Sequence, residues 1–236
     1  METPIGAPFK VKLRIEIAKL KEMTLKGKLE YIWDYYKPFI IALIAILALT
    51  AILLNTWLIN PAPKTVLFVS WSSGFATQEQ IDDLTHVLEK RLIEESENEN
   101  VIVSQAIIND DDPAASMMIH QRTVAMVAAG AIDVFILDSA LIEVYNTGGF
   151  IRPLESLLAE IKSINPAVYD KIVENVTYSL YEAEDGSTSE RITGIGVGKS
   201  PLFTKLGFFE QELYFSVVIT SSNSANILQT LLAFFD

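Results

Sequence analysis

The sequence predicts an α/β protein with one N-terminal transmembrane helix, followed by a single three-layer domain whose mostly parallel sheet also contains antiparallel strands. Three observations predict this. Residues 38–63 form an uncharged run of 26 residues. Between residues 65 and 149, short β-rich apolar runs alternate with helical patterns, as they do in parallel α/β sheets. After residue 152, the apolar runs follow one another in the manner of antiparallel strands.

The uncharged run is the clearest feature of the chain. Its apolar part, residues 39–59, would measure about 30 Å as a helix, which matches the hydrocarbon thickness of a bilayer. A buried helix of a soluble protein rarely extends this far without a polar face. The charged region before the run is too long for a secretory signal peptide, and no Ala-x-Ala cleavage site follows. We therefore predict an uncleaved signal anchor at residues 38–60 and a proline-containing spacer at residues 61–64.

Charge differs sharply on the two sides of this anchor. Residues 1–38 carry eight Lys and Arg against five Asp and Glu, whereas residues 61–236 carry ten against 25. Lysine and arginine close to one end of a membrane helix hold that end in the cytoplasm. We predict a single-pass protein of the cell membrane, with a basic cytoplasmic or interfacial segment at residues 1–37 and an extracytoplasmic domain at residues 65–236. The acidic domain would repel phosphate groups, so nucleic acid is excluded as a partner.

The residues around the anchor predict how it meets the bilayer. Thr24 is placed to cap a helix that leads into the membrane. Aromatic and basic side chains are typical of membrane interfaces. The predicted interface residues are Tyr31, Trp33, Tyr35, Tyr36 and Lys37 on the inner side and Trp57 on the outer side. Residues 9–17 alternate apolar and mostly basic side chains, which fits either a flexible tail or a segment lying on the anionic inner leaflet.

The extracytoplasmic domain divides into two halves by its pattern. The first half has three rounds of strand then helix, which indicates a parallel sheet with right-handed crossovers. Its elements are a strand at 65–71, a helix from the capping box of Thr77 and Gln80, a strand at 101–108, a helix at 112–129, a strand at 134–137 and a helix from Asp138 and Ser139 to Gly148. The second half should contain helices at 154–164 and from 165, a hairpin of strands 177–181 and 190–197, a strand at 213–220 and a last helix at 224–235.

Three segments of the domain resemble a known family. They are AIDVFILDSALIEVYNTGGFIRPLESLL at 131–158, GIGVGKSPLF at 194–203 and LYFSVVITSSNSANILQTLLAFF at 213–235. In this order they resemble one lobe of the extracellular solute-binding proteins that serve bacterial ABC importers. The resemblance implies a bacterial protein with a binding role. The family has two lobes and a lipidated cysteine or no tether, whereas this chain has room for one lobe, contains no cysteine and has a helix as its tether.

The candidate ligand-binding residues follow from the predicted sheet. In open α/β sheets, ligands bind beyond the carboxyl ends of the strands. Here we expect Trp71 to stack on a ligand and the neighbouring polar groups to form hydrogen bonds. The candidate residues are Trp71, Ser72, Ser73, Asp110, Asp138 and Ser139. The alternative is that residues such as Ser139 only cap helices.

Other motifs predict no catalytic, metal or cofactor site. Residues 109–112 and 182–186 are acidic but lack the spacing of a calcium loop, so we expect solvated turns. The glycine-rich segment 194–200 has threonine at 193, where a P-loop needs glycine, and we expect no helix after it. These glycines are expected to allow either close packing or a bend in a strand. His86 should lie on the surface and His120 should be partly buried, with no nucleophile–base motif near either.

Together these features predict a non-enzymatic, membrane-anchored extracytoplasmic binding or interaction domain without a cofactor. Its expected partners are the lipid bilayer and a membrane or cell-surface protein, so that it would be an accessory component of a cell-surface or transport-related complex. The alternative is a sensor or ligand-capture module that binds a small molecule directly.

Overall fold

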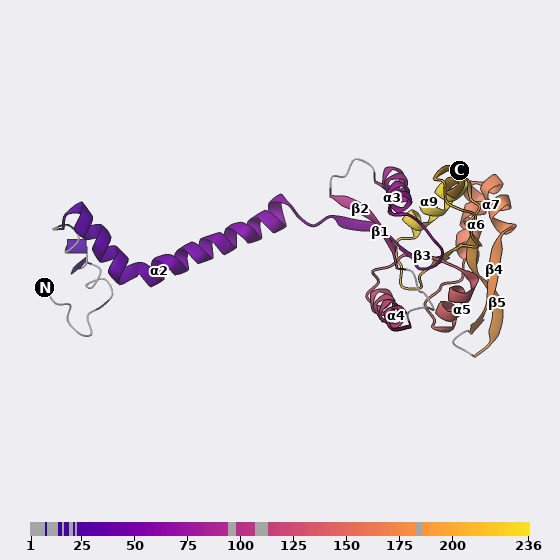
Figure 1. The fold of residues 1–236 in the computed structure, drawn as a ribbon, viewed down its shortest axis with the longest axis horizontal. Helices are drawn as coiled ribbons and strands as arrows, with labels where there is room; N and C mark the ends of the chain where they lie inside the picture. Colours follow the sequence, from indigo (N-terminus) through magenta and orange to yellow (C-terminus); the bar gives the residue numbers. More distant parts are fainter. Residues whose placement is uncertain are drawn as a thin grey trace. The chain divides into compact units, whose positions relative to one another are not determined.

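A computed structural model describes residues 8, 14–15, 17–18, 21, 23–93, 98–106, 113–182 and 186–236, without the side chains of Ile32, Tyr35 and Glu182. The chain divides into two compact units, Met1–Ala62 and Pro63–Asp236, and each is described by itself (Figure 1). Most of the alternating segment 9–17 and the acidic residues 109–112 lie outside the described residues.

The first unit is dominated by one long helix. Helix α2 (Leu25–Leu54) continues directly into a π-helical turn, η1 (Asn55–Ile59). Thr24 caps α2 as predicted, because its hydroxyl accepts a hydrogen bond from the N–H of Gly27. The segment Tyr36–Ile59 is long and apolar enough to cross a membrane, and its apolar side chains are not buried against protein.

Polar side chains in this segment bond within their own helix. The Thr50 hydroxyl donates to the carbonyl of Ile46 at 2.8 Å, and the Thr56 hydroxyl donates to the carbonyl of Ile52 at 3.0 Å. Hydrocarbon offers no hydrogen-bond partner, so internal pairing lowers the free-energy cost of placing a hydroxyl in lipid. The helix is therefore suited to a bilayer in its polar groups as well as in its length.

The second unit is an α/β domain built on a six-stranded sheet with the order β2-β1-β3-β6-β5-β4. Strand β1 (Lys64–Trp71) pairs in parallel with β2 (Glu99–Gln105) on one side and β3 (Val134–Leu137) on the other. The antiparallel strands are β6 (Tyr214–Val217), β5 (Thr188–Gly196) and β4 (Val176–Glu182). This mixed sheet confirms the predicted fold class, and the pairing of β4 with β5 confirms the predicted hairpin.

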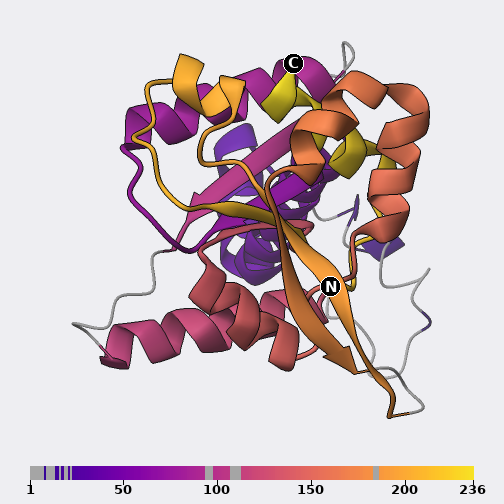
Figure 2. The ribbon, with the colours of Figure 1, turned by 90° about the vertical axis from the view of Figure 1, so that its right-hand side faces the viewer.

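Helices cover both faces of the sheet and make three layers (Figure 2). On one face lie α3 (Gln78–Leu92), α6 (Glu155–Ile164), α7 (Pro166–Val173), α8 (Pro201–Lys205) and α9 (Ser224–Phe235). On the other face lie α4 (Pro113–Ala128) and α5 (Ser139–Thr147). β1 is apolar on both sides because both sides are covered: Val69 packs in the cluster under α3 and α9, and Phe68 packs against the cluster under α4 and α5.

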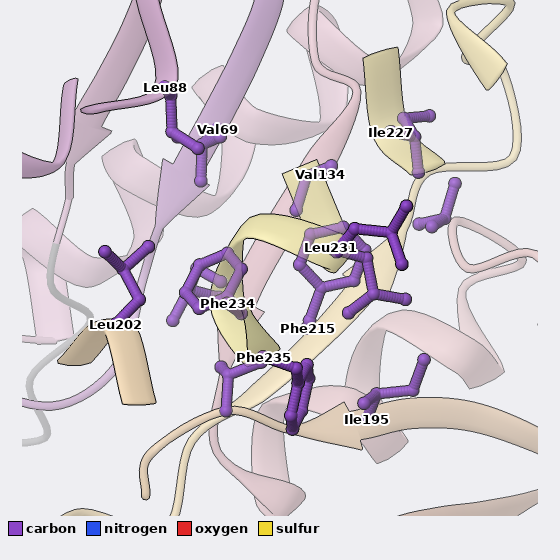
Figure 3. Packing of buried hydrophobic residues seen from close by; sticks show 14 of the residues in the cluster. Val69, Leu88, Val134, Ile195, Leu202, Phe215, Ile227, Leu231, Phe234 and Phe235 are labelled. Carbon is purple, nitrogen blue, oxygen red and sulfur yellow. The ribbon is translucent and has the colours of Figure 1, made fainter. Parts of the chain in front are cut away.

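Helix α9 fills the centre of the larger hydrophobic cluster (Figure 3). Leu231 is fully buried there, and the ring of Phe234 meets the ring of Phe215 edge-on, with centroids 6.0 Å apart. Burying one side chain of this size contributes about 1.5–3 kcal/mol. The apolar face of α9 is therefore core, as the sequence predicts for most of it.

Local signals place several helix boundaries correctly. Thr77 and Gln80 form the predicted capping box of α3, and the carboxylate of Asp138 caps α5. One expectation is wrong: a helix does follow the glycine-rich segment 194–200. This is α8, capped by Ser200, whose hydroxyl accepts from the N–H of Phe203 at 3.4 Å. It spans five residues, so its local signal is weak.

A buried carboxylate before β3 joins the middle of β1 to the connection between β6 and α9. Asp133, only 5% exposed, precedes β3 and accepts hydrogen bonds from the N–H of Phe68 (2.9 Å), the hydroxyl of Ser221 and the amide of Asn223 (3.0 Å). These donors belong to β1 and to the connection between β6 and α9. A buried carboxylate is tolerated when its lone pairs are satisfied, and this one accepts hydrogen bonds from two parts of the chain that lie far apart in the sequence.

Replacing this carboxylate should therefore destabilise the domain. In Asp133→Asn the amide group faces donors, so at least one hydrogen bond is lost, and we expect unfolding free energy to fall by about 1–3 kcal/mol. Urea unfolding of the full chain in detergent would show this through Trp71 fluorescence, in a background where Trp33 and Trp57 are phenylalanine. Asp83→Asn on the exposed face of α3 is the control. Equal midpoints for the two variants would contradict the role of Asp133.

Candidate functional site

The parallel strands β1, β2 and β3 end at the same edge of the sheet, which we call the carboxyl edge. In the register, Leu137 at the end of β3 pairs with Tyr214 at the start of β6, and Tyr214 pairs with Gly196 at the end of β5. Val176, at the start of β4, pairs with Ile195. The antiparallel half of the sheet therefore extends the same edge at which β1 and β3 end, and loops from both halves meet there.

Trp71 lies at this edge but not on its surface. Its side chain is fully buried and stacks on Phe203 (centroids 5.3 Å apart) and Phe208 (5.2 Å). Because the side chain is fully buried, no part of the ring is open to a ligand, so the expectation that Trp71 stacks on a ligand is corrected. Its role is to pack α8 and the following loop against the end of β1.

Ser72 and Ser73 are also buried. The N–H of Ser72 donates to the carbonyl of Ile136, and its hydroxyl lies 3.4 Å from that of Ser70. Burial raises the pKa of Tyr145, and the nearby hydroxyls of Thr123 and Ser72 partly offset this effect. These two candidate residues therefore belong to a buried polar layer beneath α4 and α5, where the phenol of Tyr145 stays neutral.

The other candidate ligand-binding residues lie outside this polar layer. Asp138 accepts from the N–H of Leu141 at 2.8 Å and caps α5, while Ser139 is the exposed first residue of that helix. Asp138 therefore fits the capping alternative, whereas Ser139 follows the cap. Asp110 lies outside the described residues. In the first unit, Trp33 and Trp57 are exposed, and the Lys37 ammonium lies 5.5 Å from the centroid of the Trp33 ring.

An open groove of about 580 Å³ lies farther along the same edge, beyond β6, β5 and β4. None of the candidate ligand-binding residues predicted from the sequence is among its described lining residues. Its polar lining includes Glu174, Lys199, Glu210, Gln211, Glu212 and Tyr214. Because three carboxylates face one ammonium group, the groove is acidic.

Glycines bring the two sides of the groove together. The N–H groups of Val197 and Gly198 both donate to the carbonyl of Leu213, at 2.8 and 3.2 Å. A Cβ atom on Gly198 would overlap the carbonyl oxygen of Gln211. Gly196 donates to the carbonyl of Asn175 at 2.6 Å. Close packing, one of the two roles expected from the sequence, is thus the role of this glycine-rich segment.

Gln211 connects the groove to the loop after β1, because its side chain pairs with both backbone groups of one residue. The N–H of Phe75 donates to Oε1 at 2.7 Å, and Nε2 donates to the carbonyl of Phe75 at 2.9 Å. Gly74 precedes this pair with a φ of 74°, a conformation that favours glycine. Phe75 and Phe209 are left 59% and 71% exposed on the two loops that are joined in this way.

Two of the groove carboxylates have polar partners. Glu212 accepts from the hydroxyl of Tyr214 at 2.8 Å. Burial raises the pKa of Tyr214, and the hydrogen bond and negative charge of Glu212 raise it further. Glu210 lies 3.5 Å from the ammonium of Lys199, with both side chains largely exposed. Glu174 forms no ion pair within the described part of the chain.

A second depression, of about 450 Å³, lies between α3, α8 and α9. Lys90, Arg91 and Lys205 line it, and Arg91 forms an ion pair of 2.8 Å with Asp236. These cations lie in the last turns of α3 and α8, where they stabilise the negative helix ends. Because these cations already have a structural role, the acidic groove is the better candidate for binding.

The pairing of Gln211 with Phe75 gives a direct test of how this edge is built. In Gln211→Glu the side chain can still accept from the N–H of Phe75, but it repels the carbonyl. We expect amide exchange in residues 72–77 and 207–213 of the full chain to accelerate about tenfold. Hydrogen exchange with mass spectrometry measures it, and Gln121→Glu on the exposed surface of α4 is the control. Unchanged exchange would show that the pairing does not fix the loops.

Comparisons with known proteins add little to this description. No protein-family model matches the chain, and no curated protein matches it. Among solved structures, the chain is similar to an extracellular solute-binding protein family 1 member from Alicyclobacillus acidocaldarius subsp. acidocaldarius DSM 446, with 17% sequence identity and a TM-score of 0.29. The match covers 58% of this chain and 28% of that chain.

Proposed function

We propose that this protein is a non-enzymatic binding domain, held at the outer face of a cell membrane by one helix, whose acidic groove engages a partner. The observation that carries the proposal is the groove itself. The groove is open and polar. The contacts of Gln211 and Gly198 hold the loops that line it in place. Such a fixed hollow at the carboxyl edge of an α/β sheet is suited to binding.

The anchor in this proposal comprises residues 38–60, between a cytoplasmic segment at residues 1–37 and the spacer and domain at residues 61–64 and 65–236. The exposed apolar segment Tyr36–Ile59 supports it. The excess of Lys and Arg before this segment, against a strong excess of Asp and Glu after it, supports the orientation.

The side chains with catalytic potential have structural contacts, which favours binding over catalysis. The ring of His120 stacks on Tyr145 with centroids 5.6 Å apart, and His86 is exposed on α3. Within the groove, Glu212 bonds to a phenol and Glu210 lies beside an ammonium group. Neither arrangement is a nucleophile next to a base.

Direct capture of a small molecule is the second candidate function, in a sensor or ligand-capture module. The observation that favours it is the size of the groove, since about 580 Å³ falls in the range of small-molecule sites. In this case the ligand would not contact the candidate residues Ser73, Asp138 and Ser139, which lie elsewhere along the same edge of the sheet.

The proposed topology predicts how the full chain behaves in cells. It should stay with membranes after carbonate washing, because the apolar helix loses its favourable environment in water. Protease added to intact spheroplasts should digest residues 65–236 and spare an epitope tag placed at the N-terminus. Replacing Ala45 and Leu49 by arginine should release the protein from the washed membranes. A protected domain, or a chain that washes off, would contradict the topology.

Binding in the groove predicts a change in thermal stability. The full chain in lipid nanodiscs would be screened against sugars, amino acids, amines and short peptides, and a ligand at 100 times its Kd should stabilise the domain by about 2.7 kcal/mol. Asn175→Trp, which fills the groove, should abolish the shift, whereas Glu143→Trp on the surface of α5 should preserve it. If no compound shifts the unfolding temperature, or both variants respond alike, the groove is not the binding site.

A further inference from the structure

We infer that the partner is a protein with an exposed, extended basic segment, which binds along the acidic groove and the two phenylalanines beside it; this inference rests on the proposed function. We call the groove lining together with Phe75 and Phe209 the carboxyl-edge surface. Three features of this surface carry the inference: its charge, its fixed aromatic rings and the weak pairing of its carboxylates.

Charge complementarity is the first feature. Glu174, Glu210 and Glu212 line the groove, and Lys199 is the one basic residue among the described residues of the lining. Glu174 is also the cap at the carboxyl end of α7, where the helix itself presents negative charge. Residues 61–236 carry a net charge of −15. A field of this sign attracts cationic segments and repels phosphates and anionic lipid.

The exposed aromatic rings are the second feature. Phe209 directly precedes the groove-lining residues 210–213. Phe75 lies on the loop after β1, and its pairing with Gln211 joins the two loops. Their exposure is therefore part of the fold. Aromatic faces bind the aliphatic stems of Lys and Arg and attract their charged ends, so rings beside carboxylates suit basic side chains better than a purely apolar partner.

The weak internal pairing of the carboxylates is the third feature. The ion pair between Lys199 and Glu210 is exposed, with both side chains 78% accessible, and such pairs contribute little. An incoming guanidinium can therefore replace Lys199 without a large loss. Arginine has the planar geometry for two parallel hydrogen bonds to one carboxylate. The surface extends from Glu174 past Gln211 to the phenylalanines, which favours a segment of several residues over a single amine.

Peptide binding to the full chain tests this inference. The chain would be placed in nanodiscs of neutral phosphatidylcholine, and a labelled peptide of about nine residues, alternating Arg and Leu, would be titrated by fluorescence anisotropy. We expect saturable binding that weakens with salt, and at least about tenfold weaker binding of the same peptide with Glu in place of Arg. Absence of binding, or equal binding of both peptides, would overturn the inference.

Matched variants separate the groove from the general charge of the domain. The triple variant Glu174→Gln, Glu210→Gln and Glu212→Gln should weaken binding about tenfold or more. The control triple variant Asp83→Asn, Glu143→Gln and Glu160→Gln removes the same charge elsewhere and should change binding by less than about twofold. Equal losses in the two would show non-specific attraction and overturn the site.

Two further binding measurements identify which class of ligand binds the groove. Phe75→Ala with Phe209→Ala should weaken peptide binding several-fold while leaving its salt dependence unchanged, because the rings carry no charge. Spermidine at equal concentration should compete poorly with the peptide; full competition would show that a small amine is the ligand and overturn the peptide assignment. If a neutral compound stabilises the domain through the groove but the basic peptide does not bind, the proposed function stands and this inference fails.

Discussion

The contact between Gly198 and the backbone of Gln211 is the constraint on which the candidate site depends. With no Cβ on Gly198, residues 197–198 come close enough for two N–H groups to share the carbonyl of Leu213. This fixes the loop before β6, and Gln211 then connects that loop to the end of β1 by pairing with Phe75. The groove and its exposed rings are thus consequences of one close backbone approach in the antiparallel half of the sheet.

The sequence predicts most of the fold because its signals are local. The capping box of Thr77 and Gln80 needs four residues, and the strand patterns of β1 and β3 need fewer than ten. The burial and pairing of Asp133 are not predicted by local signals. Its donors Ser221 and Asn223 lie about 90 residues farther along the chain, so only the folded sheet shows that this carboxylate is buried and satisfied.

The site is less predictable than the fold, and Trp71 shows why. Its place at the end of β1 follows from the sequence, but the direction of its side chain is set by Phe203 and Phe208. These belong to the short helix α8 and the residues after it, which the glycine-rich pattern does not reveal. The groove is hidden for a related reason, because Glu174 and Glu212 become neighbours only when β4, β5 and β6 align their ends.

An open groove also limits which ligand can bind well. Closed sites bury most of a small ligand, whereas a groove open along one side leaves part of a free solute in water. A polypeptide segment compensates by contacting more than the groove, since Phe75 and Phe209 add area beside it. Attachment of both partners to one membrane would further raise their effective concentration, so modest affinity would suffice. The same geometry that weakens the case for a captured solute therefore strengthens the case for a protein partner.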